Sequence, residues 1–387
     1  RPKRPKMMTG VLTPLRLYDT AQRKVVDFNP KPEVTFYLCG ITPYDATHLG
    51  HAATYVIYDV LERRLQQRGH TTRLVRNITD VDDDILRAAR RRGVHHLDLA
   101  FGGVRQFDVD MEALGNLAPW REPRATGAIP EIRGLIHKLL DKQAAYVVDG
   151  TVFFDVSSAP DFGKLSGLSS DAMVRIGAER GEEPGDPRKR NPLDSVLWVP
   201  SGADEPAWDA PWGRGRPGWH VECSALALRY LGSPVDLHGG GTDLIYPHHE
   251  CSAAQVEAAT GQPLADHWMH QAMVVHEGEK MSKSLGNLVF VADLLRCHDP
   301  MALRLLLLSH HYRRSWSWDP RLLTTADDRL KRWRAAKNNT ESPTLVGQIG
   351  ALLDDDLDAP GALAVIDQAV TQGQGAKTAA ACLGVVL

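Results

Sequence analysis

The chain has 387 residues but few cysteines and no excess of charge of either sign. Its five cysteines are odd in number and widely scattered, which argues against a disulfide framework and favours cytosolic thiols or metal ligands. The 45 Lys and Arg residues are balanced by 48 Asp and Glu, a net charge of −3. This balance argues against a dedicated polybasic nucleic-acid binder, although it leaves room for a local basic patch.

Long apolar runs are also missing. The longest aliphatic stretch, 303–308, is far shorter than the roughly 20 residues of a membrane helix, and no apolar segment follows the basic start of the chain. We therefore expect a cytoplasmic protein without a membrane partner. Residues 1–14 do not begin with Met, and we expect them to be disordered or foreign to the natural chain.

The composition that remains is that of a globular protein, with 43% hydrophobic and 24% charged residues and a length typical of two or three domains. Apolar patterns near the start predict a strand, a helix, a strand and a helix in turn. This alternation is typical of a parallel α/β sheet. The predicted elements are strands 34–39 and 72–78 and helices 49–68 and 80–92.

The middle of the chain breaks this pattern. A helix at 127–142, a hairpin at 145–156 around Asp149-Gly150 and a charged, Gly/Pro-rich loop at 177–191 predict an inserted α+β subdomain, residues 115–192. The sheet domain would comprise 15–114 and 193–290, because helices at 219–231 and 250–260 and strands at 235–238 and 268–275 follow. Helical periodicity from 291 to 387 predicts a C-terminal helical bundle, and the absence of heptads favours a monomer.

Two short motifs carry candidate chemistry. His48-Leu-Gly-His51 opens the first helix, where two imidazoles share one face and helix-dipole donors suit a nucleotide phosphate. Lys280-Met-Ser-Lys283-Ser follows the strand that ends near Val275, and its lysines and hydroxyls suit departing pyrophosphate. Either motif alone is explained as well by capping histidines or a solvated turn. Together, at the ligand-binding edge of a parallel sheet, they favour ATP chemistry.

The two motifs resemble the HIGH and KMSKS signatures of the class I aminoacyl-tRNA synthetases, with Leu49 in place of Ile. The resemblance implies a Rossmann-like catalytic domain that activates a carboxylic acid with ATP, with Mg²⁺, to give an acyl-adenylate and pyrophosphate. It further implies that His48 and His51 stabilise the transition state, and that Lys280 and Lys283 hold the departing pyrophosphate.

Segments around Cys39, Cys223 and His248 are similar to the zinc-binding loops of cysteinyl-tRNA synthetases, and the stretch Asn77–Asp82 also resembles that family. The resemblance implies one Zn²⁺ per chain, and zinc prefers a thiolate to a hydroxyl, so such a site selects cysteine over serine. The synthetases carry a glutamate ligand where this chain has Ser252, so we expect the substrate thiolate to complete the tetrahedron. Three further cysteines are interpreted as packing residues: Cys251, Cys297 and Cys382.

The stretch Gly40–Ala52 resembles the cysteine:glucosaminyl-inositol ligases of mycothiol synthesis more closely than the synthetases, and Thr54 lies near the usual synthetase arginine. Residues 179–184 resemble that family's ERGGDP segment, with Glu182 and Glu183 departing from it. The short region after Ser284 and the absence of a basic tail also favour the ligase, which implies small-molecule partners and no nucleic acid. The alternatives are a truncated cysteinyl-tRNA synthetase and a non-catalytic paralogue.

The same resemblance implies a set of contacts to the cysteinyl-adenylate. Asp243 is read either as a partner of the substrate ammonium or as a turn residue, and Trp219 either as a pocket wall or as core. Four histidines, His220, His238, His249 and His270, receive no role. The implied contact residues are Cys39, Gly40, Ile41, Thr42, Thr54, Asn77, Ile78, Thr79, Trp219, Gly241, Thr242, Asp243 and Val274.

Overall fold

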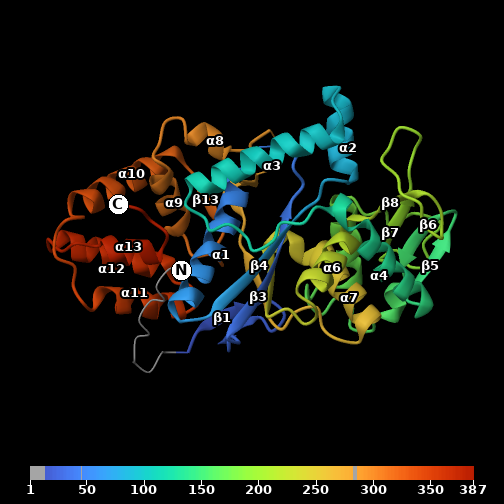
Figure 1. Cartoon of the computed structure of the whole chain (residues 1–387), viewed down its shortest axis with the longest axis horizontal. Helices are drawn as coiled ribbons and strands as arrows, with labels where there is room; N and C mark the ends of the chain where they lie inside the picture. The colour runs from blue at the N-terminus through green and yellow to red at the C-terminus, as the bar shows by residue number, and fades with distance from the viewer. Residues whose placement is uncertain (1–13, 45, 282–285) are drawn as a thin grey trace, which may run out of the picture.

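The computed structural model describes residues 14–44, 46–281 and 286–387. A parallel sheet occupies the centre of an elongated molecule, with an antiparallel sheet at one end and a bundle of helices at the other (Figure 1). This is the α/β architecture with an insertion and a C-terminal helical region that the sequence predicts.

The central sheet has four parallel strands in the order β10-β9-β3-β4. The chain runs from β3 outward to β4 and later returns to the other side of β3 through β9. The strand order therefore reverses between β3 and β9, and ligands of open α/β sheets bind at the carboxyl ends beside such a reversal. The strands are β3 (Glu33–Ile41), β4 (Thr71–Ile78), β9 (Leu237–Gly241) and β10 (Trp268–Gln271).

Strand β3 is buried on both faces, as its nearly continuous apolar run predicts. Phe36 and Leu38 belong to the core that contains α1 (Leu49–Gln67), whereas Tyr37 and Cys39 belong to the core on the opposite face. Because successive strand side chains point to opposite faces, Cys39 is directed toward α6 (Trp219–Tyr230) and α7 (Glu250–Thr260).

The inserted region is larger than the sequence analysis assigns. The hairpin at Asp149-Gly150 is confirmed, with positive φ at both turn residues. Its antiparallel sheet, however, continues through two later strands, so the boundary at 192 is wrong and the sheet ends near 217. Two helices precede this region, α2 (Asp83–Arg92) and α3 (His96–Ala113). The elements of the region itself are α4 (Ile129–Asp141), β5 (Ala145–Val148), β6 (Thr151–Phe154), α5 (Ser170–Glu179), β7 (Ser195–Pro200) and β8 (Gly215–Pro217).

Two other expectations need correction. The single strand at 268–275 is two strands in different sheets, β10 and β11 (Val274–His276), because the chain leaves the central sheet after Gln271. The region after Val291 is not wholly helical, since β13 (Trp316–Trp318) pairs with β11. The remaining elements are β1 (Arg16–Asp19), β2 (Lys24–Asp27), β12 (Glu279–Lys280), α8 (Val291–Leu294), α9 (Pro300–Leu308), α10 (Pro320–Ala335), α11 (Leu345–Asp354), α12 (Ala359–Thr371) and α13 (Lys377–Cys382).

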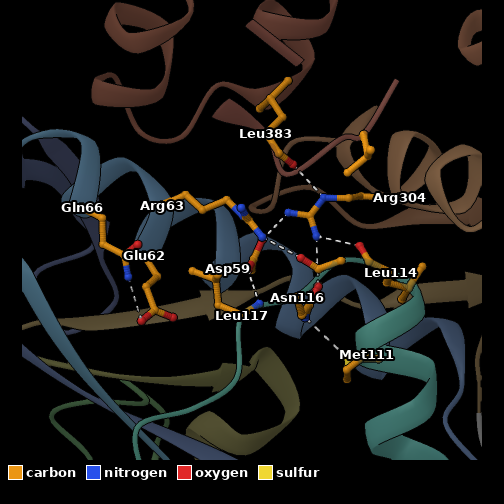
Figure 2. A network of polar contacts seen from close by, with 12 residues as sticks. Asp59, Glu62, Arg63, Gln66, Met111, Leu114, Asn116, Leu117, Arg304 and Leu383 are labelled. Atoms are coloured by element: carbon orange, nitrogen blue, oxygen red, sulfur yellow. Dashed lines mark hydrogen bonds and ion pairs between the residues drawn. The ribbon is translucent and has the colours of Figure 1, made fainter. Parts of the chain in front are cut away.

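The C-terminal helices share one hydrophobic core with α1 and the central sheet. At this junction the fully buried Arg304 of α9 contacts the carboxylate of Asp59 on α1 (Figure 2). Its guanidinium also donates to the Leu383 carbonyl at 2.7 Å and to Asn116 Oδ1 at 3.0 Å. The network ties three distant segments of the chain to one cation.

Within the described ranges, the structure contains no helix that is both long enough and apolar enough to traverse a membrane.

Candidate active site

The first motif forms the N-terminus of α1 at the carboxyl end of β3. His48 caps the helix, its Nδ1 accepting a hydrogen bond from the Gly50 amide at 3.1 Å, and its ring stacks on that of His51 with centroids 3.7 Å apart. A Cβ at Gly50 would lie 2.9 Å from the His48 ring. Glycine is therefore required for the two imidazoles to stand together at a helix N-terminus.

His51 is uncharged at neutral pH. Burial lowers its pKa to about 4, although the nearby Asp243 carboxylate acts in the opposite direction. In the free protein this imidazole therefore carries no positive charge toward a phosphate. A neutral ring still offers one N–H to a phosphate oxygen.

The segment that follows the second motif lies beside the first motif. The Leu49 amide donates to the Val289 carbonyl at 3.0 Å, and the Val291 amide donates to the Thr47 carbonyl at 2.8 Å, so the segment after the lysine motif runs along the start of α1. The Lys280 backbone belongs to β12. Its side chain and all of Lys283 lie outside the described part of the structure.

A cavity of about 560 Å³ opens beside the first motif, and we call it the adenylate cavity. It lies at the strand-order reversal and is lined by both histidines of the first motif, Met281 and Leu288. Many residues of the implied contact set also line it: Cys39, Gly40, Ile41, Thr42, Thr54, Trp219, Gly241, Asp243 and Val274.

Four implied contact residues do not line this cavity: Asn77, Ile78, Thr79 and Thr242. The Asn77 side chain supports the wall instead, because its Oδ1 accepts from the Gly40 amide at 2.8 Å and its Nδ2 donates to Thr79 at 3.1 Å. Ile78 is core, and its backbone pairs with Ile41.

A cluster of sulfur and imidazole groups lies on the α6 side of the cavity. Cys39 Sγ is 3.8 Å from Cys223 Sγ, and His248 Nε2 is 3.2 Å from Cys223 Sγ. All three ligand atoms lie within 4.8 Å of one another, and all three residues are buried. The structure therefore brings together the three residues that the sequence analysis names as metal ligands.

The donor set fits zinc. Two thiolates bound to tetrahedral zinc at about 2.3 Å stand about 3.8 Å apart, which is the separation of the two sulfurs here. Burial raises the pKa of Cys39; burial also opposes ionisation of Cys223, but Cys39 and His248 outweigh it and set the pKa of Cys223 well below its usual value. Without a metal, Cys39 therefore keeps its proton and donates it to the Cys223 thiolate, and a bound cation would displace that proton.

His248 is held by two neighbours. Its ring stacks on Trp219 with centroids 4.2 Å apart, so Trp219 serves both as a pocket wall and as a support. Its Nδ1 lies 2.9 Å from His220 Nδ1, and His220 Nε2 lies 2.9 Å from Glu182. The segment 177–191, predicted as a charged, Gly/Pro-rich loop, is therefore anchored to the Cys39, Cys223 and His248 cluster through Glu182.

The other cysteines and Ser252 lie apart from the cluster. The Ser252 hydroxyl donates to the His220 carbonyl at 3.2 Å, and Cys251 packs beside Tyr246. Cys251 and Cys382 are buried, as expected of packing residues. Cys297 is exposed, so its interpretation as a packing residue is wrong.

Sequence reasoning missed His249. Its Nε2 lies 3.1 Å from Cys39 Sγ, and Cys39, His238 and His249 form a second group close enough to hold a metal. The backbone at Tyr246 is non-helical, and beyond this kink His248 is directed at Cys223 while His249 is directed at Cys39. The adjacent pair of histidines is the one signal in the sequence that marks this position.

Comparison with known proteins defines the class first. The family model described as tRNA synthetases class I (C) catalytic domain matches residues 25–328. Methionyl-tRNA synthetase from Mycobacterium tuberculosis, solved with methionyl-adenylate, has a TM-score of 0.63 and 17% identity, covering 91% of this chain and 87% of its own. A LeuRS from Agrobacterium radiobacter has a TM-score of 0.62 and 13% identity over 93% of this chain and 83% of its own. The fold is that of a class I synthetase catalytic domain.

Curated relatives narrow the class. The L-cysteine:1D-myo-inositol 2-amino-2-deoxy-alpha-D-glucopyranoside ligase of Thermobispora bispora is 50% identical over 95% of this chain and 92% of its own length. The ligase of the same name from Acidothermus cellulolyticus is 49% identical over 92% of this chain and 89% of its own. The chain belongs to this family of class I synthetase-like ligases.

Proposed function

We propose that this protein joins L-cysteine to the amine of glucosaminyl-inositol in two steps, with ATP as the energy source. The observation that carries the proposal is the high identity to the ligases over nearly the whole chain. The Cys39, Cys223 and His248 cluster beside the adenylate cavity supports cysteine as the activated acid.

In the first step the cysteine carboxylate attacks the α-phosphorus of ATP, and the bond to the departing pyrophosphate breaks. His48 and His51, stacked at the N-terminus of α1, would donate hydrogen bonds to the phosphoryl oxygens as charge develops. Lys280 and Lys283 would hold the pyrophosphate, and Asp243 would pair with the substrate ammonium. The contact set named from the sequence would hold the adenylate, with Asn77 and Thr79 acting through the Gly40 amide.

Zinc bound by Cys39, Cys223 and His248 would supply a soft Lewis acid that accepts a thiolate and rejects a serine hydroxyl. This selects cysteine without an editing site. Trp219 and the His220–Glu182 pair would orient the His248 ring, as outer partners of metal-bound histidines do.

We further propose that ATP is used with Mg²⁺, that the protein acts as a cytoplasmic monomer without nucleic acid, and that residues 15–114 belong to the catalytic domain and 291–387 to a C-terminal bundle. Leu345, Ile349, Leu363 and Ile366 of α11 and α12 are buried, so these helices contribute much of their apolar surface to the core.

The test is isotope exchange between ATP and pyrophosphate in the purified protein. We expect exchange with cysteine and none with serine, followed by AMP release when glucosaminyl-inositol is added but not when tRNA is added. Transfer to tRNA would identify a cysteinyl-tRNA synthetase. No exchange with cysteine would indicate a non-catalytic paralogue.

A further inference from the structure

A second cavity, of about 620 Å³, adjoins the adenylate cavity. The two share Thr42, Asp84 and Trp219 in their linings. The second cavity is bounded by the start of α2, residues 179–189, strands β7 and β8, and the start of α6. We call it the acceptor cavity. A molecule bound in the acceptor cavity can therefore reach an adenylate bound in the adenylate cavity directly.

The acceptor cavity contains buried polar groups with unused hydrogen-bonding capacity. The Lys189 side chain is 1% exposed, and its ammonium has no hydrogen-bond partner among the described residues, although Glu182 lies 3.6 Å away as an ion pair. Arg216 Nε is likewise buried and makes no hydrogen bond within the described structure, although the Glu205 carboxylate lies 3.6 Å away as an ion pair. Each donor has a carboxylate nearby but makes no hydrogen bond, so a hydroxyl-rich ligand in this cavity would supply the acceptors that these buried groups favour.

Asp82 lies where the two cavities meet. Its Oδ1 caps α2 by accepting from the Ile85 amide at 2.8 Å, and its Oδ2 accepts from the Thr42 hydroxyl at 3.2 Å. Because Thr42 lines both cavities while Asp82 lines the acceptor cavity, the carboxylate is one hydrogen bond away from the adenylate cavity. An amine that entered from the acceptor side would pass this carboxylate on its way to the adenylate.

The raised pKa of the Asp82 carboxylate suits a role as a proton acceptor near neutral pH. Burial raises its pKa to about 6, so it is mostly ionised at pH 7 and yet a better base than an exposed aspartate. The groups that face it are Asp83 and Asp84 on its own helix, the neutral Thr42 hydroxyl, and Glu222 on α6, whose pKa burial raises well above its usual value.

We propose that the acceptor cavity binds the amino-sugar polyol and that Asp82 accepts the proton released when its amine is acylated. The inference rests on the proposed function, and it names the second substrate's site. In the step, the neutral amine attacks the adenylate carbonyl and a C–N bond forms. The carbonyl–phosphate bond then breaks, AMP leaves with the electron pair, and the ammonium proton passes to Asp82.

Two variants test the two parts of the inference. Asp82→Asn retains a side chain that caps the helix and accepts from Thr42 but does not take a proton as carboxylate does. It is expected to reduce kcat for amide formation about 100-fold. Val199→Phe narrows the acceptor cavity from β7 and is expected to raise the KM for glucosaminyl-inositol at least about tenfold. Cysteine-dependent exchange between ATP and pyrophosphate should stay within about twofold in both.

Matched controls are Asp98→Asn, the same change in the first turn of α3, and Val147→Phe on the exposed side of β5. Both should leave amide formation unchanged. Normal exchange combined with unchanged acceptor kinetics in Asp82→Asn and Val199→Phe would overturn the inference, as would loss of exchange in Asp82→Asn. Absence of exchange in the unaltered protein would instead overturn the proposed function.

Discussion

Cys39 and Cys223 are 184 positions apart in the chain, yet their sulfurs are 3.8 Å apart. Strand β3 presents one and the first turns of α6 present the other, so the two sulfurs meet only because β3 packs against α6. Cys251 is equally buried but packs beside Tyr246, away from both sulfurs. Burial of a cysteine is thus a poor guide to its role, whereas the identity of its neighbours is decisive.

We predict that Cys223→Ser weakens zinc binding about 100-fold or more and abolishes cysteine-dependent exchange, because a hydroxyl is a poor zinc ligand. Competition with a chromophoric chelator measures the affinity. Cys251→Ala is the matched control and should retain a full equivalent of zinc. Loss of half the zinc in that control would show that Cys251, and not the assigned set alone, binds the metal.

A second prediction concerns pH. His51 has a pKa of about 4 in the folded protein against about 6.5 unfolded, so the unfolded chain binds more protons between these values and stability falls on acidification. Between pH 7 and pH 4.5 this histidine should cost about 2 kcal/mol of the free energy of unfolding. His51→Gln should remove that part of the loss in urea titrations.

The exposed His137→Gln serves as the control and should keep the pH dependence of the unaltered protein. If the free energy of unfolding changed with pH to the same extent in His51→Gln and in the unaltered protein, the assignment of a neutral imidazole to His51 would be contradicted.

At the scale of elements, the ends of β3 and β4 hold the adenylate cavity in shape. The pairing of these strands shifts register between Leu38 and Ile41, and Gly40 fills the irregular position. A Cβ at Gly40 would lie 1.5 Å from the Asn77 carbonyl oxygen, on backbone that has nowhere to move. Glycine is required here by close approach of two strands, not by a positive φ.

We predict that Gly40→Ala lowers the free energy of unfolding by about 2–4 kcal/mol and disrupts adenylate formation, because it pushes β3 and β4 apart at the site. At Gly134, on the open surface of α4, an added Cβ would meet no other atom within 4 Å. Gly134→Ala should therefore raise the free energy of unfolding by about 0.5–1 kcal/mol through helix propensity. Urea unfolding of both variants checks the pair, and equal effects would refute the close-approach argument.

At the scale of the whole molecule, Arg304 joins the C-terminal helices to the sheet domain. The cation is fully buried on α9 and contacts Asp59 on α1, which also accepts from the Leu117 amide at 2.7 Å (Figure 2). A buried ion pair adds little net stability, but removal of Arg304 would leave the Asp59 carboxylate with Arg63 as its remaining cation, at 2.7 Å. The junction therefore depends on both residues together.

We predict that Arg304→Met lowers the free energy of unfolding by about 3–5 kcal/mol, since it leaves Asp59 with Arg63 alone and removes the donor of the Leu383 and Leu114 carbonyls. Arg321→Met, which removes an exposed arginine paired with Asp319, should cause no measurable change.

Calorimetry should show one unfolding transition for the unaltered protein, because one hydrophobic core spans α1 and the C-terminal helices. Two well-separated transitions would contradict that view.

Local patterns along the chain were enough to predict β3, α1, β4, the Asp149-Gly150 hairpin and α7, because each has its own periodicity or turn chemistry. They failed where distant contacts decide the outcome. The end of the insertion depends on the pairing of β7 with β6 and of β8 with β7, and the break at 271–274 depends on the pairing of β11 with β13. Strand partners far along the chain leave no local signal.

The sequence by itself determined the chemistry on offer: two imidazoles at a helix start, a lysine-rich motif after a strand, and thiols and a histidine suited to zinc. Only the tertiary structure decided which groups meet, because proximity follows from packing. It placed His249 against Cys39, left Cys297 exposed, removed the charge from His51 by burial, and opened a second cavity beside Asp82. Residue type sets what a side chain can do, and burial and neighbours set whether it does so here.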